Sequence, residues 1–177
     1  TLASVGLLID RKGHHHIIRA LKDLPETDLV IAGDGPDRRM LERLAEEMGV
    51  KDRVRFLGSV DQNRLRELYN AVDALVLASS REGWANVLLE AMACGTPVAA
   101  SAVWGTPEVV TSPEAGVLMP SLDPQGVIES VRKLFAAYPD HAATRRYAEG
   151  FDWQATTQGQ LDLFRSIIEG RKARARQ

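Results

Sequence analysis

The 177-residue chain is long enough to bury one core, and its 45% apolar and 26% charged residues exclude an intrinsically disordered protein. A formal net charge of −2 gives no strong field that would attract nucleic acid or an acidic membrane surface. Because Cys94 is the one cysteine, no internal disulfide can form, and the apolar runs are too short to span a bilayer.

Short apolar runs alternate with amphipathic stretches, which predicts alternating strands and helices. In the first half, strands are predicted at residues 3–9, 28–32 and 54–57. Each is followed by a predicted helix, at residues 17–24, 36–49 and 61–71. Pro36 is expected at the first turn of its helix, Gly49 at that helix's end, and Asp61 as the cap of the next helix.

The second half continues the alternation and then becomes helical. Strands at 74–78, 97–100 and 117–119 enclose helices at 85–94 and 107–110, and three helices follow at 124–137, 141–149 and 153–169. This order predicts an α/β fold, a doubly wound Rossmann-like parallel sheet of about six strands with helices on both faces. Ligands of such sheets bind outside the carboxyl ends of the strands. That rule selects the loops at 6–13, 33–36, 58–61, 79–86 and 101–106.

The most informative segment runs from Ser80 to Pro97 and carries two glutamates. Glu82 follows a strand, and Glu90 lies one turn into the next helix, on a face with Asn86 and Val87 that can look toward the ligand crevice. The opposite face is expected to pack on the sheet through Leu88, Ala91, Met92 and Gly95. A carboxylate can accept hydrogen bonds from vicinal hydroxyls, and the free N–H groups near residues 83–87 favour an anion. The segment therefore indicates a site for a sugar joined to phosphates.

Segment 80–97 resembles the donor-site signature of glycosyltransferase family 4. The resemblance extends, in order, to Lys12-Gly13, Gly33-Asp34-Gly35-Pro36, Phe56-Leu57-Gly58 and Gly105-Thr106-Pro107-Glu108. It implies that residues 1–177 are the C-terminal, nucleotide-sugar-binding domain of a retaining GT-B enzyme, with the N-terminal acceptor domain missing. The chain opens on Thr1 within an apolar run, so it is expected to be an excised fragment.

The resemblance assigns a role to each matching position. Glu90 would hold the ribose hydroxyls, Glu82 the hydroxyls of the transferred sugar, and Lys12 the diphosphate as it leaves. Backbone N–H groups of Gly83, Trp84 and Asn86 would meet the donor sugar or diphosphate. Val87 would lie against the nucleotide, and Gly58, Ser59 and Val60 would line the pocket for the base. Gly13 and Gly33 complete the donor-binding positions.

The resemblance also implies partners and location. The donor, UDP- or GDP-linked, is a substrate, and neither a cofactor nor a metal is expected. The partners are the nucleotide sugar and the protein's own N-terminal domain, without nucleic acid or a transmembrane segment. A cytoplasmic enzyme is expected, peripheral at the inner membrane surface in the full-length protein and inactive as the isolated domain. The last helix carries an apolar face that could drive dimers, formed by Leu161, Leu163, Phe164 and Ile167.

Three positions depart from the family pattern. Leu7 stands where many relatives carry an arginine that helps to hold the diphosphate. Either Arg11 substitutes, or the diphosphate is held more weakly, or the cation lies elsewhere. Asn86 stands where glycine is common, and Trp84 where phenylalanine is common.

Several residues admit another interpretation. His14, His15 and His16 suggest a metal site, but three adjacent helical residues cannot share a face, so surface histidines are expected. Cys94 at a helix end suggests a nucleophile, but no partner motif supports that role, so a buried or inert thiol is expected. The Gly-x-Gly at 33–35 hints at an NAD-dependent oxidoreductase, but Arg38, expected on an exposed helix turn, occupies the place of the third glycine. A non-catalytic nucleotide-sugar-binding module remains an alternative, for which Leu7 is the support.

Overall fold

The computed structural model describes residues 1–152 and 154–174, so the predicted helix start at Trp153 lies outside the described residues. Six strands form one sheet in the order β3-β2-β1-β4-β5-β6, and every neighbouring pair is parallel. The strands are β1 (Leu2–Val5), β2 (Leu29–Ala32), β3 (Val54–Gly58), β4 (Ala74–Leu77), β5 (Val98–Ser101) and β6 (Gly116–Met119). The predicted doubly wound parallel sheet is confirmed.

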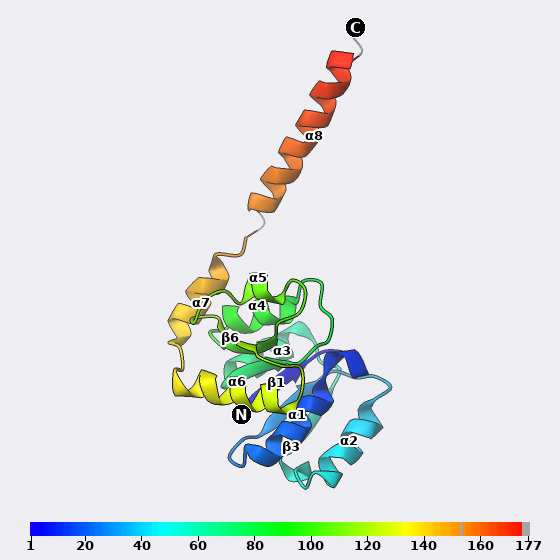
Figure 1. Cartoon of the computed structure of the whole chain (residues 1–177), viewed down its shortest axis with the longest axis vertical. Helices are drawn as coiled ribbons and strands as arrows, with labels where there is room; N and C mark the ends of the chain where they lie inside the picture. Colours follow the sequence, from blue (N-terminus) through cyan, green and yellow to red (C-terminus); the bar gives the residue numbers. More distant parts are fainter. Residues whose placement is uncertain (153, 175–177) are drawn as a thin grey trace.

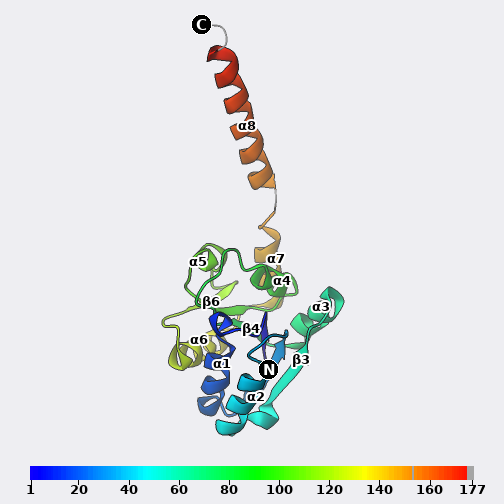
Figure 2. The same cartoon turned by 90° about the vertical axis from the view of Figure 1, so that its right-hand side faces the viewer.

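Helices cover both faces of the sheet (Figures 1 and 2). The helices are α1 (His14–Ala20), α2 (Arg38–Glu47), α3 (Gln62–Ala71), α4 (Asn86–Ala93), α5 (Thr106–Val109), α6 (Pro124–Ala136), α7 (His141–Glu149) and α8 (Gln154–Arg174). One apolar core lies under α1, α2 and α6, and a second lies under α3, α4 and α7. Because both faces are covered, β1, β4 and β5 are buried along their whole length, as their uninterrupted small and apolar sequences require.

The first strand is shorter than predicted because the chain turns at Gly6. Gly6 has a φ of +151°, and the N–H of Leu8 then donates to the carbonyl of Asp34 at 3.0 Å. The apolar side chain of Leu8 enters the core under α1, so its burial does not need a longer strand. The chain continues through a short 3-10 turn, η1 (Asp10–Lys12), into α1.

The second predicted helix starts later than expected, whereas the cap of the third is confirmed. Helix α2 begins at Arg38, so Pro36 lies in the turn before the helix and the N-cap is Asp37. Gly49 follows the end of α2 with a φ of +68°, as expected of a helix stop. Asp61 caps α3 by accepting a hydrogen bond from the N–H of Arg64 at 2.8 Å.

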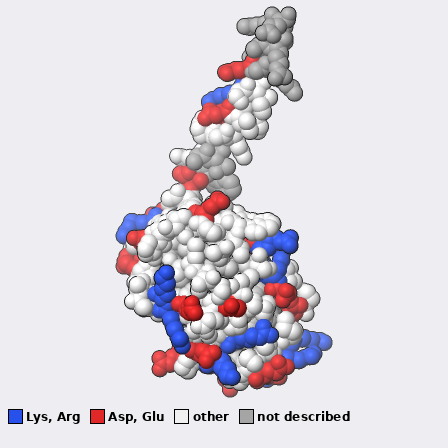
Figure 3. Space-filling view, viewed as in Figure 1, with Lys and Arg blue, Asp and Glu red and all other residues white. Residues whose placement is uncertain are grey.

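The long helix α8 extends away from the body of the domain (Figures 1 and 2). Its apolar side chains are 43–57% exposed, and they are Leu161, Leu163, Phe164, Ile167 and Ile168. Across residues 1–152 and 154–174, no helix is long and apolar enough to cross a membrane. Figure 3 shows acidic and basic side chains interspersed on the face that it draws, with no large patch of one sign.

Candidate functional site

Two loops at the carboxyl ends of β1 and β4 bring Lys12 and Glu82 together. Ser80 donates its backbone N–H to the carbonyl of Arg11 at 2.8 Å, which ties the two loops to each other. Lys12 Nζ then lies 2.5 Å from Glu82 Oε1, and the two side chains are only 18% and 10% exposed. The structure therefore places both predicted residues in one partly buried ion pair, 70 positions apart in the chain.

Glycines allow this close approach. Gly13 has a φ of +68°, and a Cβ there would lie 1.8 Å from the carbonyl oxygen of Ala78 at the end of β4. Gly6 lies against the aliphatic stem of Lys12, since a Cβ on Gly6 would be 3.6 Å from Lys12 Cδ. A side chain at position 13 would push the Lys12 loop away from β4 and separate the pair.

Helix α4 begins beside this pair and offers unused backbone donors. Its N-cap, Ala85, has no capping side chain. Within the described part of the chain, the N–H groups of Gly83, Trp84 and Val87 have no acceptor. The N–H of Asn86 differs from the prediction, because it donates to the carbonyl of Trp84 at 3.0 Å and so is already used. A lysine beside free N–H groups at a helix start is an arrangement that favours a bound anion.

Glu90 is held by a residue that the sequence reasoning missed. The hydroxyl of Tyr69 on α3 donates to Glu90 Oε2 at 3.0 Å, and Tyr69 itself is 1% exposed. Burial and the neighbouring Glu90 carboxylate raise the pKa of Tyr69, so its hydroxyl stays protonated as a donor. Leu88, Ala91 and Met92 are fully buried on the sheet side of α4, as predicted. The one available signal for Tyr69 was its place on the apolar stripe of α3.

A small cavity of about 230 Å³ lies next to the Lys12 loop. Its lining combines the ends of β1 and β2 with the loop after β3, through Val5, Gly6, Leu7, Ala32, Gly33, Asp34, Ser59, Val60 and Leu65. Gly58 adjoins it with a φ of +74°, and its carbonyl accepts the N–H of Gly33 at 2.8 Å. The predicted positions Gly33, Gly58, Ser59 and Val60 therefore meet here, whereas Lys12, Glu82 and Glu90 do not line this cavity. Leu7 is 54% exposed on its rim.

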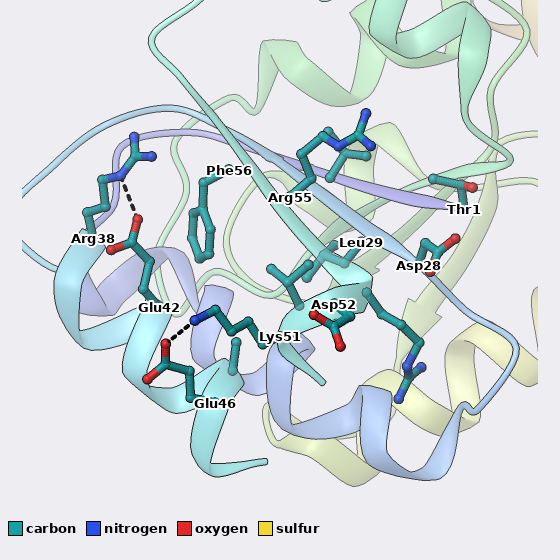
Figure 4. Close-up of a pocket in the computed structure, with 14 residues that line it drawn as sticks. Thr1, Asp28, Leu29, Arg38, Glu42, Glu46, Lys51, Asp52, Arg55 and Phe56 are labelled. Atoms are coloured by element: carbon teal, nitrogen blue, oxygen red, sulfur yellow. Dashed lines mark hydrogen bonds and ion pairs between the residues drawn. The ribbon is translucent and has the colours of Figure 1, made fainter. Parts of the chain in front are cut away.

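Another cavity, of about 700 Å³, lies elsewhere (Figure 4). It lies beside the amino-terminal ends of β2 and β3 and along α2, and no predicted site residue lines it. Two ion pairs lie on its wall: Arg38 pairs with Glu42 at 2.9 Å and Lys51 with Glu46 at 2.5 Å. Because ligands of parallel sheets bind at the carboxyl ends, this cavity is not the candidate site.

The expectation of three surface histidines is wrong for His14. His14 is 2% exposed, its Nε2 donates to the carbonyl of Leu7 at 3.3 Å, and its Nδ1 accepts from Ser4 Oγ at 2.9 Å. Burial lowers the pKa of His14 to about 4, so the ring is neutral and braces the loop after β1. Among the residues that the structure describes, no group of three His, Cys, Asp or Glu side chains is placed to hold a metal ion.

The structure also shows the surroundings of Arg38 and Cys94. Arg38 is partly buried, with its guanidinium carbon 5.7 Å from the centre of the Phe56 ring, and so is not a freely exposed helix residue. Cys94 is partly buried, and burial raises the pKa of its thiol, which disfavours the nucleophilic thiolate.

Comparison with known proteins identifies the family. A family model described as "Glycosyl transferases group 1" matches residues 1–151. The lipopolysaccharide core biosynthesis glycosyltransferase LpsD of Rhizobium meliloti is 34% identical over 171 residues, which cover 92% of this chain and 48% of that protein.

Solved structures agree. The sucrose-phosphate synthase of Thermosynechococcus elongatus matches with a TM-score of 0.82 and 30% identity over 96% of this chain and 46% of that one. Anabaena HepE, solved in complex with UDP-glucose, matches with a TM-score of 0.81 and 25% identity over 93% and 48%. The chain thus spans about half the length of the relatives it matches. With a family match over residues 1–151, a GT-B-like sheet and relatives of this identity, the chain belongs to the group 1 glycosyltransferases.

Proposed function

We propose that this chain is the donor-binding domain of a retaining glycosyltransferase of family 4, which moves a sugar from a nucleoside-diphosphate sugar to a carbohydrate or lipid-linked acceptor. The observation that carries the proposal is the Lys12–Glu82 pair at the start of α4, beside the free N–H groups of Gly83 and Trp84. A cation and free donors suit a diphosphate, and an adjacent carboxylate suits sugar hydroxyls.

The donor would extend along the carboxyl edge of the sheet. The base would occupy the cavity at Ser59 and Val60, the ribose would reach Glu90, and the diphosphate would lie at Lys12 with the sugar at Glu82. When the diphosphate binds, the ammonium of Lys12 would pair with it in place of Glu82. Glu82 would then be free to accept hydrogen bonds from the sugar hydroxyls. Since the charge on the leaving phosphate grows as the glycosidic bond breaks, Lys12 would stabilise the transition state more than the bound donor.

In a retaining, front-face reaction the acceptor hydroxyl attacks from the side on which the diphosphate leaves. The bond between the anomeric carbon and the phosphate oxygen breaks, and the new bond to the acceptor oxygen forms on the same face. The hydroxyl proton passes to the departing phosphate oxygen, so no step requires a metal ion or a protein base. This chain's part is to bind the donor, orient the sugar and stabilise the leaving group.

The relatives supply support for the donor and acceptor classes. HepE was solved with UDP-glucose, which favours a UDP-linked donor, and LpsD belongs to lipopolysaccharide core biosynthesis, which favours a saccharide acceptor. The relatives are about twice as long as this chain, which supports a separate acceptor domain in the full-length protein. A cytoplasmic enzyme at the inner membrane surface is part of the same proposal, and fractionation of cells expressing the full-length protein tests it.

Calorimetric titration tests the donor site. UDP, GDP, ADP and NAD are titrated into this chain, into Glu90→Ala and into the control Glu67→Ala, whose side chain is exposed on α3 and pairs with Arg64. We expect one nucleoside diphosphate to bind, Glu90→Ala to weaken it about tenfold or more, and Glu67→Ala to leave it unchanged. Saturable NAD binding without a response to nucleoside diphosphates would instead support an oxidoreductase.

Transfer assays on the full-length protein separate an enzyme from a non-catalytic binding module. The exposed Leu7, in place of the usual arginine, is the observation that favours such a module. We expect transfer by the full-length protein to fall steeply in Lys12→Ala and in Glu82→Ala. Full activity in both variants would contradict the assigned roles, and robust transfer by the 177-residue chain alone would contradict the division into two domains.

A further inference from the structure

His14, the first residue of α1, is a buried polar side chain whose two ring nitrogens both have partners. The side chain is 2% exposed. Its Nε2 lies 3.3 Å from the carbonyl oxygen of Leu7, and its Nδ1 lies 2.9 Å from Ser4 Oγ. Because a carbonyl oxygen can only accept, Nε2 carries the proton and Nδ1 accepts from the serine hydroxyl. The two hydrogen bonds therefore hold the ring in one orientation and one tautomer.

The residue that His14 holds lies at the candidate donor site. Leu7 lines the cavity at the ends of β1 and β2, and a Cβ on the preceding Gly6 would lie 3.6 Å from Lys12 Cδ. The Leu7 carbonyl also accepts the N–H of Ile9 at 2.9 Å. The N–H of Leu7, in contrast, has no acceptor within residues 1–152 and 154–174. His14 thus fixes a residue that carries an unused N–H next to both the cavity and the lysine.

The next residue of this loop is held without His14. The N–H of Leu8 donates to the carbonyl of Asp34 at 3.0 Å, and the carbonyl of Leu8 accepts the N–H of Asp37 at 3.1 Å. Loss of the His14 bond should therefore loosen Leu7 and leave the rest of the turn in place. A leucine side chain cannot pair with a phosphate, so the backbone N–H is the group through which position 7 can bind an anion.

We propose that His14 is a positioning residue of the donor site, which fixes the backbone of Leu7 so that the Leu7 N–H donates to the diphosphate beside Lys12. An N–H that is already held in place binds an anion without the cost of ordering the loop. His14 itself stays covered and touches no substrate. This inference rests on the proposed function, because it takes the diphosphate to lie at Lys12.

Two variants of His14 separate positioning from packing. In His14→Gln the amide nitrogen reaches about as far as Nε2 and can still donate to Leu7, whereas the shorter amide of His14→Asn can bond only to Ser4. Both variants lose the ring, so urea unfolding should show a lower stability for both. In calorimetric titrations with UDP, we expect His14→Asn to bind about 3- to 10-fold more weakly than the parent chain and His14→Gln to stay within twofold of it.

The amide resonance of Leu7 in nitrogen-15 NMR reports the proposed contact directly. We expect UDP to shift this resonance saturably and uridine, which lacks the phosphates, to leave it unshifted. Ser4→Ala removes the partner that fixes the tautomer of His14, so the shift should shrink and UDP should bind about 2- to 5-fold more weakly. The matched control is Ser130→Ala, which loses a buried serine hydroxyl that bonds to the carbonyl of Gly126 on its own helix, and which should keep both the shift and the affinity.

The outcomes separate this inference from the proposed function. If UDP binds the parent chain but does not shift the Leu7 amide, or binds His14→Asn as tightly as the parent chain, the positioning role is overturned and the proposed function stands. If His14→Asn does not fold, the serine pair decides, and equal UDP affinities of Ser4→Ala and Ser130→Ala overturn the role. Failure of the parent chain to bind any nucleoside diphosphate would overturn the proposed function, and this inference with it.

Discussion

Substitution of Tyr69 by phenylalanine tests whether Glu90 must be oriented in order to bind a nucleotide. The change removes one hydroxyl, whose hydrogen bond to Glu90 Oε2 is 3.0 Å long, and keeps the ring that fills the core. A hydrogen bond to a charged acceptor contributes about 1.5–3 kcal/mol. Because Glu90 is only partly buried and water can replace the hydroxyl, we expect a loss of about 1–2 kcal/mol in the free energy of unfolding.

The effect on binding follows from the freed carboxylate. Without Tyr69, Glu90 can turn away from the position in which it would receive the ribose, so UDP binding should weaken about 3- to 10-fold, or about 0.7–1.4 kcal/mol. Urea unfolding measures the stability, and calorimetry with UDP measures the affinity. Both are done at pH 7.

Tyr147→Phe is the matched control. The Tyr147 hydroxyl donates to the carbonyl of Val109 at 2.8 Å and accepts from the N–H of Thr111 at 3.2 Å, so this variant also loses hydrogen bonds of a tyrosine hydroxyl, but none of them to Glu90. We expect it to lower stability and leave the UDP affinity unchanged. If Tyr69→Phe binds UDP as tightly as the parent chain does, or if both variants weaken binding equally, Glu90 does not act through an orientation set by Tyr69.

Three further predictions follow from the site. Gly13→Ala places a Cβ 1.8 Å from the carbonyl oxygen of Ala78 at a φ of +68°, so urea unfolding should show that the free energy of unfolding falls by more than about 2 kcal/mol. Gly83→Ala has open space around the new Cβ and should lower the free energy of unfolding far less. Burial lowers the pKa of His14 from 6.5 to about 4, so on acidification the unfolded chain binds this proton before the folded chain does. The free energy of unfolding should therefore fall by about 2 kcal/mol between pH 7 and pH 5, and His14→Leu should abolish this part of the fall. Lys12→Met should weaken UDP binding about tenfold and reduce its dependence on salt, as titrations at two ionic strengths would show; an unchanged salt dependence would place the diphosphate elsewhere.

Much of the fold followed from local patterns in the sequence. Strands that are buried on both faces must be apolar throughout, and helices between them must be amphipathic, so their alternation predicted the six-stranded parallel sheet. The exceptions lie where an apolar residue is buried without belonging to a strand. Leu8 extended the predicted first strand, but the chain turns at Gly6 and Leu8 enters the core from a loop.

The same limit applies to single side chains. Spacing correctly indicated that three adjacent histidines cannot share one helix face. It could not reveal that α1 packs under β1, which buries His14 against Ser4. Nor could it distinguish Tyr69 from an ordinary core aromatic, because the acceptor of its hydroxyl lies on another helix, 21 positions along the chain.

By itself, the sequence determined the fold class, the loops at the carboxyl edge and the identity of the charged residues on them. Only the tertiary structure decided which of those residues meet. Lys12 reaches Glu82 because β1 and β4 are neighbours in the sheet and because Gly13 lets their loops touch. Strand order is set by the packing of helices on both faces and by the hand of the crossovers, which are properties of the whole chain and not of any one segment.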